Sequence, residues 1–312
     1  MRKIIGIGET VLDIIFKGKQ PIQAVPGGSA FNTIISIGRA GIPAMFIGET
    51  GNDKVGEWVR SFLEENHVDA SALNIFPDSR SPLSLAFLDE NGNADYLFYK
   101  DHPHDKIDFN YPTIEPDDVV VFGSFFAINP VVRPQVAGFL EYAHQQGAIL
   151  YYDVNYRASH RNDLLRVTPN IIENLELADI VRGSNEDFEI MYRKTSADAV
   201  FKAEISFYTH NFIYTRGAEP VEVRDKSGFA KQYAVPANEQ VVSTIGAGDN
   251  FNAGFLFGLV KYGITREQVE NGLTEQQWDQ LIESAQRFSA NVCQRLDNSI
   301  SPEFGEEMKA SL

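Results

Sequence analysis

Short apolar segments alternate with segments of helical length along most of the chain, and this alternation is the strongest constraint on its fold. Six segments rich in Ile, Val, Tyr and Phe have the length of buried strands: KIIGIG, AMFIGE, VVVFGS, AILYYDV, DIVRGS and NFIYTRG. Segments long enough for helices lie between most of them, such as residues 131–146 and 163–177. The sequence therefore predicts an α/β three-layer sandwich, with a mainly parallel central sheet covered by helices on both faces.

Two regions interrupt this alternation. Residues 10–25 lack a helical pattern and contain two candidate short strands, and residues 81–100 have the pattern of a hairpin with its turn at Asn91 and Gly92. No low-complexity linker borders either region. We therefore expect one domain over residues 1–312, with these two segments forming a small projecting β-sheet.

Composition and charge exclude several classes of function. The chain of 312 residues contains 27 basic and 43 acidic side chains, and its net charge of −16 repels nucleic acids and anionic membrane surfaces. The single cysteine, Cys293, excludes an internal disulfide and a metal site built from several thiolates. No apolar run approaches the roughly 18 residues of a membrane span. The sequence thus predicts a cytoplasmic protein that binds small molecules rather than nucleic acid or membrane.

The segment STIGAGDNF, residues 243–251, places Asp249 where a glycine-rich turn meets an amphipathic segment. Phe251, Phe255 and Leu259 follow at helical spacing. One interpretation is structural, since Asp near a helix start accepts hydrogen bonds from unpaired amides. The other is catalytic, since the turn leaves amides bare enough to hold an anion beside a carboxylate that takes a proton. Capping is the more common of the two for such a segment taken alone.

A second glycine turn, in VPGGSAFN, leads into a segment whose apolar face contains Phe31, Ile34 and Ile35. Asn32, Ser36 and Arg39 lie on another face. A solvated polar stripe is one interpretation of that face. A ligand site is the other, because the two glycines let a ligand approach the backbone and one Asn both donates to and accepts from a polyol.

Asp13 lies within TVLDIIF, where a strand would place it on the same face as Val11 and Ile15. Such a carboxylate either lies beneath a cover or faces a polar ligand, or else it belongs to a solvated strand edge, and the buried and solvated interpretations are about equally supported. A carboxylate binds two sugar hydroxyls well, so a hydroxyl-rich substrate would account for it.

Polar residues also follow two predicted strands. YYDVNYR ends one strand with Asp153, Asn155 and Arg157, and RGSNEDFE ends another with Glu186 and Asp187. Ligands of open parallel sheets bind beyond such carboxyl ends, and these acids suit Mg²⁺ held largely through water. The alternative is that they cap the helices that follow.

Familiar nucleotide-binding motifs are missing from the sequence. GxxxxGK[ST] does not occur. The opening GIGETV begins like a dinucleotide-binding turn, but Val11 stands at the position of the third glycine and no helical pattern follows. The alternative hypothesis of a nicotinamide-dependent oxidoreductase depends on this segment alone.

Taken together and in order, these segments resemble the PfkB, or ribokinase-like, family of carbohydrate kinases. GGSAFNTIISIGRAGIPAMFIGETGNDKVG and STIGAGDNFNAGF carry the resemblance, and DVNYR, SNED and TRG lie between them at the expected places. The resemblance spans nearly the whole chain, and IGETVLD, DVNYR and the serine of SNED are most similar to the fructokinase branch. It implies a ribokinase-like fold in which residues 10–25 and 81–100 form a β lid over the sugar.

The resemblance also implies an ATP- and Mg²⁺-dependent kinase that phosphorylates a sugar hydroxyl, with fructose as the expected sugar. Asp249 matches the catalytic base, and the anion hole is matched by Gly246, Ala247 and Gly248. The positions that match sugar or transferred-phosphate contacts are Asp13, Gly28, Asn32 and Arg157. Those that match the nucleotide site are Ser184, Thr215, Gly217 and Asn291, with Glu186 and Asp187 near the metal.

Two departures from the family pattern bear on cofactors. The acid that helps ribokinases hold a monovalent cation is replaced by Ser243, which leaves potassium activation open. The family's NxxE motif is replaced by Ser184 and Asp187 at its ends. Several members pair through the lid, which implies a homodimer.

Alternative functions within and outside this class remain. Ribose, 2-keto-3-deoxygluconate and nucleosides are competing substrates. A sugar- or nucleotide-binding sensor without catalysis could use the same fold. Retention of Asp249 with the whole Gly-Ala-Gly turn favours an enzyme, because binding alone requires no base.

Overall fold

The computed structural model describes residues 2–89, 94–100, 110–237 and 241–312. The chain divides into two compact units, each built from separate stretches of sequence. The first unit comprises Met1–Asn110, Asn238–Tyr262 and Gln280–Leu312. The second comprises Tyr111–Ala237 and Gly263–Asp279. The organisation as one domain stays a prediction.

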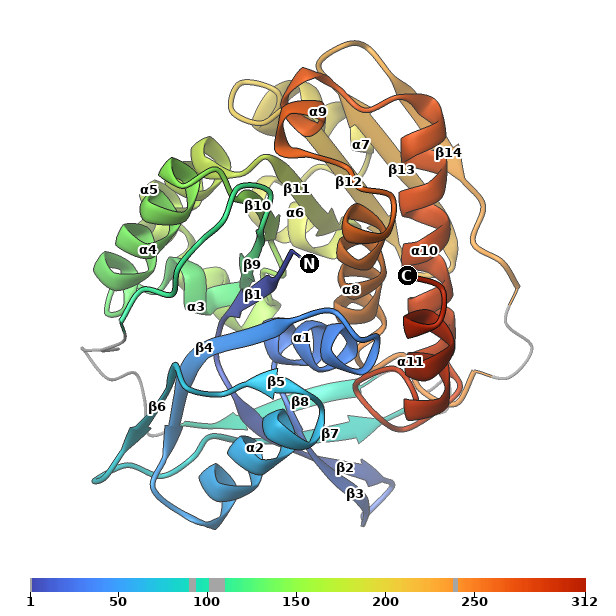
Figure 1. Ribbon diagram of the computed structural model, residues 1–312. Helices are drawn as coiled ribbons and strands as arrows, with labels where there is room; N and C mark the ends of the chain where they lie inside the picture. Colours follow the sequence, from blue (N-terminus) through green and yellow to red (C-terminus); the bar gives the residue numbers. More distant parts are fainter. Residues whose placement is uncertain (1, 90–93, 101–109, 238–240) are drawn as a thin grey trace. The chain divides into compact units, whose positions relative to one another are not determined.

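The first unit contains a parallel layer with helices packed on it (Figure 1). Strand β1 (Ile4–Ile7) pairs in parallel with β4 (Ala44–Gly51), which also pairs in parallel with β5 (Val68–Asp69) and β6 (Leu73–Phe76). The helices are α1 (Ser29–Arg39), α2 (Lys54–Glu65), α8 (Ala247–Lys261), α11 (Pro302–Lys309) and most of α10 (Glu275–Cys293). Helix α1 packs against β1, β4 and α8.

A small, separate four-stranded sheet also belongs to the first unit, in the order β3-β2-β7-β8 (Figure 1). Its strands are β2 (Val11–Lys17), β3 (Gln20–Gly27), β7 (Leu83–Leu88) and β8 (Ala94–Tyr99). Strand β2 lies between β3, which is antiparallel to it, and β7, which is parallel. The two interrupting segments are therefore strands, as expected, and the predicted turn at Asn91 and Gly92 lies outside the described residues.

The second unit contains the strand order β14-β13-β12-β11-β10-β9. Strands β9 to β12 are parallel, and β13 and β14 are added antiparallel. Their bounds are β9 (Val119–Gly123), β10 (Ile149–Asp153), β11 (Ile180–Ser184), β12 (Asn211–Arg216), β13 (Glu219–Asp225) and β14 (Ala230–Tyr233). Every apolar segment that the sequence predicts as a strand is a strand.

Helices of the second unit connect these strands. The two helices expected from segment length are α4 (Arg133–Gln145) and α5 (Leu164–Leu177). The others are α3 (Ser124–Ile128), the 3₁₀ turn η1 (Ala158–Asp163), α6 (Asn185–Tyr192), α7 (Ala197–Val200), the π-helical turn η2 (Phe201–Ile205) and α9 (Arg266–Asn271). The prediction of an α/β fold with mostly parallel main strands and a small separate sheet is confirmed.

Helices α1 and α8 meet along a polar seam. The apolar face of α1 is buried, as predicted, but so is the face that contains Asn32 and Ser36. Ser36 Oγ lies 2.6 Å from Oδ1 of Asn250 on α8 and donates to it. The interpretation of this face as a solvated stripe is therefore wrong. The predicted apolar stripe of α8 is confirmed, since Phe255 and Leu259 are fully buried.

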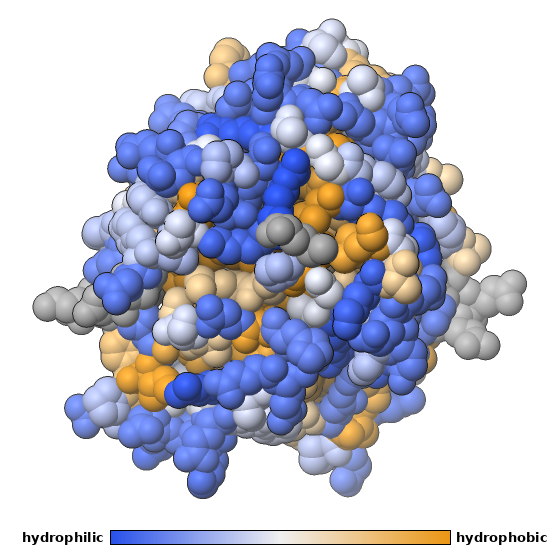
Figure 2. All heavy atoms as spheres, in the orientation of Figure 1, coloured by the Kyte–Doolittle hydropathy of each residue, from blue (hydrophilic) through white to orange (hydrophobic). Residues whose placement is uncertain are grey.

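Among the described residues, no helix is long and apolar enough to cross a membrane. The face shown in Figure 2 is mostly hydrophilic, with apolar residues in smaller patches.

Candidate active site

The start of α8 is a glycine turn, as the sequence predicts. Gly246 precedes the helix with φ 74° and ψ 0°, a left-handed conformation that favours glycine. A Cβ at this position would lie 2.6 Å from the main-chain oxygen of Asn298, so a side chain would be crowded as well as strained. Ala247 and Gly248 begin the helix, and Asp249 stands in its first turn. The carboxylate is thus beside the helix's unpaired amides and the positive end of its dipole.

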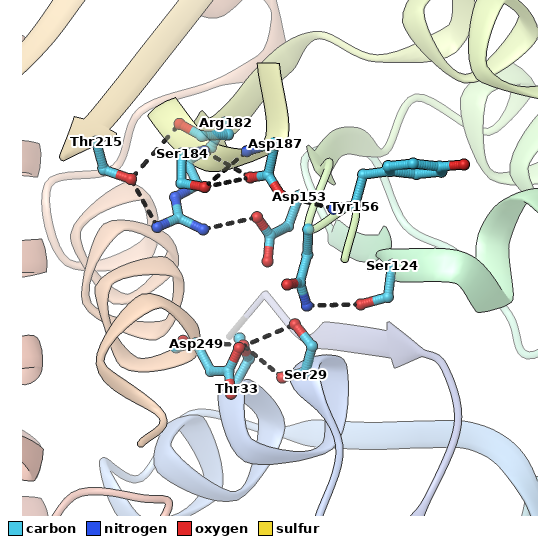
Figure 3. Close-up of polar contacts among 12 residues, drawn as sticks. Ser29, Thr33, Ser124, Asp153, Tyr156, Arg182, Ser184, Asp187, Thr215 and Asp249 are labelled. Atoms are coloured by element: carbon cyan, nitrogen blue, oxygen red, sulfur yellow. Dashed lines mark hydrogen bonds and ion pairs between the residues drawn. The ribbon is translucent and has the colours of Figure 1, made fainter. Parts of the chain in front are cut away.

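Asp249 is bound by residues from the first turns of α1. Ser29 Oγ donates to Oδ1 of Asp249 over 2.9 Å, and Asn32 Nδ2 donates to Oδ2 over 2.8 Å. Thr33 Oγ1 donates to the main-chain oxygen of Asp249 over 2.9 Å. Figure 3 shows Ser29, Thr33 and Asp249 directed toward one another. These neutral donors hold the carboxylate in one orientation.

Asp13 is buried rather than solvated, so the edge interpretation is wrong. Its side chain is 5% exposed, and β2 is covered by a strand on each side. Ser84 Oγ, from β7, donates to Oδ1 of Asp13. Asn298 Nδ2 donates to Oδ2 over 2.6 Å. The carboxylate is therefore fixed from two directions.

Gly28 and Asn32 lie at the start of α1. Gly28 precedes the helix with φ 130°, and a Cβ there would overlap the main-chain oxygen of Glu9. Asn32 is 4% exposed, and its Oδ1 has no hydrogen-bond partner among the described residues. Asn32 therefore joins Asp249 through its nitrogen and keeps an acceptor for a ligand.

Buried Arg182 connects three strand ends of the second unit. Its Nη1 donates to Asp153 Oδ1 over 2.9 Å, and its Nη2 donates to Thr215 Oγ1 over 2.8 Å, as Figure 3 shows. Arg182 and Asp153 are neighbours in the register of β11 and β10. The sequence reasoning missed Arg182, although an arginine inside the short buried strand IVRGS is the signal that could have revealed it.

Ser184 and Asp187 form a capping box at the start of α6 (Figure 3). Asp187 Oδ2 accepts from Ser184 N over 2.6 Å and from Ser184 Oγ over 2.8 Å, and Oδ1 accepts from Tyr156 N over 2.7 Å. Burial raises the pKa of Asp187, against the opposite effects of these hydrogen bonds and of Arg182. These contacts are those of a helix cap, which the sequence analysis gave as the alternative to metal binding.

The neighbouring Glu186 is exposed, so its carboxylate is open to water and suits water-mediated contact with Mg²⁺ better than Asp187 does. Within the described ranges, no group of three or more His, Cys, Asp or Glu residues is arranged to hold a metal ion.

The other residues assigned from the resemblance lie apart from these networks. Arg157 is exposed beyond β10, immediately before η1. Gly217 lies in the turn between β12 and β13. Asn291, on α10, accepts a hydrogen bond from Ser301 N over 2.9 Å through Oδ1, so it supports the segment that enters α11. Asn291 and Thr215 belong to different compact units.

The position that differs from the cation-binding pattern is also buried. Ser243 is 0% exposed, and its Oγ accepts from Ile245 N over 3.1 Å. It offers a neutral oxygen where the family usually has a carboxylate.

The N-terminal glycines do not begin a dinucleotide-binding turn. Strand β1 ends at Ile7 and strand β2 starts at Val11, so a strand rather than a helix follows GIGETV. The helix N-terminus on which a pyrophosphate would rest is therefore missing from this position.

A carboxylate oriented at a glycine-lined helix start, within an α/β fold that has a small separate sheet, is the arrangement expected from the resemblance to a carbohydrate kinase. The sequence matches the description "pfkB family carbohydrate kinase" over residues 1–303. The chain therefore belongs to the pfkB family and is a sugar kinase.

Curated relatives agree with this class. The chain is 28% identical over 294 residues to a fructokinase of Rhizobium leguminosarum bv. trifolii, covering 91% of this chain and 85% of the relative. It is 26% identical over 271 residues to probable fructokinase-4 of Arabidopsis thaliana, covering 82% of each.

Solved structures share the fold. A fructokinase double mutant from Vibrio cholerae, solved with fructose, ADP and potassium ion, has a TM-score of 0.83 at 20% identity, covering 97% of this chain and 95% of that one. Aminoimidazole riboside kinase from Salmonella enterica, complexed with aminoimidazole riboside and an ATP analog, has a TM-score of 0.81 at 19% identity, covering 99% of both chains.

Proposed function

We propose that this protein transfers the γ-phosphate of ATP to a hydroxyl group of fructose. The hydroxyl oxygen attacks the γ-phosphorus, its proton passes to Asp249, and the bond from the γ-phosphorus to the bridging oxygen breaks to release ADP. The products are a fructose phosphate and ADP. Phosphoryl transfer of this kind requires positioning and charge stabilisation more than covalent chemistry.

The orientation of Asp249 is the observation that carries this proposal. Ser29 and Asn32 each donate to one of its carboxylate oxygens, at 2.9 and 2.8 Å. A helix cap would direct the carboxylate to its own helix, whereas these contacts direct it to α1. The amides of Gly246, Ala247 and Gly248 serve as the anion hole for the phosphoryl group in flight.

Fructose is the proposed sugar because the relatives named above are fructokinases. In this proposal Asp13 and Asn32 bind sugar hydroxyls, and Gly28 lets the sugar approach the backbone. Arg157 contacts the sugar or the transferred phosphate. The burial of Asp13 supports its role, because a buried carboxylate is costly unless polar partners surround it.

ATP is the proposed phosphate donor, since the related Vibrio cholerae structure was solved with ADP. The nucleotide positions carried over from the resemblance are Ser184, Thr215, Gly217 and Asn291. Mg²⁺ would neutralise charge on the phosphates, with Glu186 and Asp187 contributing through water. An ATP-consuming sugar kinase is expected in the cytoplasm.

The small sheet is the proposed dimer interface. Three of its large apolar side chains are exposed, namely Ile22 (41%), Leu97 (49%) and Tyr99 (56%). A second copy would remove these groups from water. Light scattering of the wild type and of an L97E variant tests this arrangement, because a charge at the interface would favour the monomer.

The experiment that tests the function is a coupled assay of ADP release over a panel of sugars and nucleosides, with and without potassium. We expect fructose to give the highest kcat/KM. Because Ser243 carries no charge, we also expect similar rates in potassium and in a salt of a bulky organic cation. Sugar binding without ADP release would identify a sensor, and a different preferred substrate would move the protein to another branch of the family.

A further inference from the structure

Asn298 lies in the segment between α10 and α11 and contacts the proposed sugar-binding carboxylate. Its Nδ2 donates to Oδ2 of Asp13 over 2.6 Å. Both side chains are buried, with 1% of Asn298 and 5% of Asp13 exposed. A hydrogen bond to a buried ionised group is stronger than one between neutral groups, so this contact constrains the direction of the carboxylate.

The main chain of Asn298 contacts the other end of the site. Its oxygen accepts from Asn250 Nδ2 on α8 over 2.8 Å. The same oxygen would lie 2.6 Å from a Cβ added at Gly246, so the main chain packs directly on the glycine turn. One residue therefore connects Asp13 with the helix start that contains Asp249.

The side-chain oxygen of Asn298 has no hydrogen-bond partner in the described part of the chain. Its Oδ1 is buried and accepts no hydrogen bond from the described residues. Asn32 has the same arrangement, with Nδ2 on the carboxylate of Asp249 and Oδ1 without a donor. A buried carbonyl oxygen without a donor is unfavourable, and sugar hydroxyls are donors that would satisfy both.

Gly27 packs directly against the hydrogen-bonded side chains of Asp13 and Asn298. A Cβ at Gly27 would overlap Oδ2 of Asp13 and would lie 2.8 Å from Nδ2 of Asn298. The absence of a side chain at this position therefore leaves room for the hydrogen bond between them.

We propose that Asn298 determines sugar affinity, as a positioning residue that holds the Asp13 carboxylate through Nδ2 and provides Oδ1 as a further acceptor for a sugar hydroxyl. This inference rests on the proposed function, because it requires Asp13 to bind the sugar. It predicts an effect on KM for the sugar rather than on kcat.

The first test replaces Asn298 by Ala. We expect KM for fructose to rise about tenfold or more, with kcat changed much less. The matched control is Asn211→Ala in the second unit. Asn211 is also a buried amide whose Nδ2 is paired, to the main-chain oxygens of Asp179 and Val269, and whose Oδ1 lacks a partner. Its loss should affect stability without changing KM.

The second test uses the nearly isosteric Asn298→Asp, which preserves volume if the Ala variant does not fold. Two carboxylates in this contact cannot both ionise easily, so they share a proton at low pH and repel each other at higher pH. We therefore expect KM for the sugar to rise with pH in Asn298→Asp but not in Asn298→Ala. A general packing role would not produce this dependence.

Direct binding separates this inference from the proposed function. Fructose affinity is measured by calorimetry without nucleotide, alongside ADP release by the wild type. If the wild type phosphorylates fructose but Asn298→Ala has normal KM and affinity, or Asn298→Asp has a KM independent of pH, the role of Asn298 is wrong. If the wild type phosphorylates no sugar, the proposed function itself fails.

Discussion

Asn32 donates its Nδ2 hydrogen to Oδ2 of Asp249 over 2.8 Å and thereby joins the first turn of α1 to the first turn of α8. The two residues are 217 positions apart in the sequence. These contacts direct the carboxylate to α1 rather than to its own helix, while the glycine turn that begins α8 lies beside it.

Ser29 should position the base through the other carboxylate oxygen. Replacing Ser29 by Ala removes one donor to Asp249, and we expect kcat to fall about tenfold. Because Ser29 acts on the orientation of Asp249, KM for fructose should change much less than kcat. Steady-state kinetics of ADP release measure both parameters.

The control for this variant is Ser61→Ala. Ser61 also donates from a helix, to the main-chain oxygen of Trp58, but on the exposed side of α2. An unchanged kcat in Ser29→Ala, or the same loss of kcat in both variants, would remove Ser29 from the positioning role.

Arg182 should be important for stability. It forms a 2.9 Å ion pair with Asp153, and the side chains are only 9% and 3% exposed. Replacing Arg182 by Met leaves a buried carboxylate without its charged partner, and we expect the free energy of unfolding to fall by about 3–5 kcal/mol. Denaturant unfolding measures this change.

A matched surface pair provides the comparison. Arg60 and Glu64 on α2 form an ion pair at 3.0 Å in which both side chains are 55% exposed. Arg60→Met should change stability little, because solvent screens such a pair. Equal losses in the two variants would contradict the special role of the buried network.

Asp179 should make stability depend on pH. Burial raises its pKa to about 6 from an ordinary value of 3.8, although the Leu150 amide and Arg266 act in the opposite direction. Because the folded pKa is the higher one, the folded protein binds this proton more tightly than the unfolded chain does. The contribution to stability is therefore present below pH 3.8 and is lost as pH rises through about 6.

Asp179→Asn isolates this contribution. A difference of about two pH units corresponds to about 3 kcal/mol, so the variant should gain roughly that much relative to the wild type between acidic and neutral pH. The free energy of unfolding of both proteins, measured across this range, checks the expectation. Parallel curves would mean that Asp179 titrates normally in the folded state.

The sequence alone predicts the main strands and helices and the acidic residue at the start of α8, Asp249. Apolar segments of strand length indicate buried strands. The helical spacing of apolar residues from Phe251 to Leu259 indicates the helix that contains Asp249 in its first turn. The sequence also reveals the segments of the small sheet, because they lack helical periodicity.

The partners of the site residues were harder to predict, because they depend on contacts between distant segments. Ser84 and Asn298 are 71 and 285 positions from Asp13, and no local pattern relates them. Arg182 meets Asp153 only through the register of β10 and β11. The position of β2 between two strands, rather than at an edge, is likewise not determined by an isolated strand pattern.

The central claim is that Asp249 takes the proton of the sugar hydroxyl during phosphoryl transfer. The most direct measurement compares the rate of fructose phosphate formation, followed by phosphorus NMR, in the wild type and in Asp249→Asn, with the exposed Asp78→Asn as the control for loss of one charge. We expect the wild type and Asp78→Asn to form product at similar rates. Asp249→Asn should be at least ~10²-fold slower in kcat with nearly unchanged fructose affinity. Near wild-type turnover in Asp249→Asn would contradict the account.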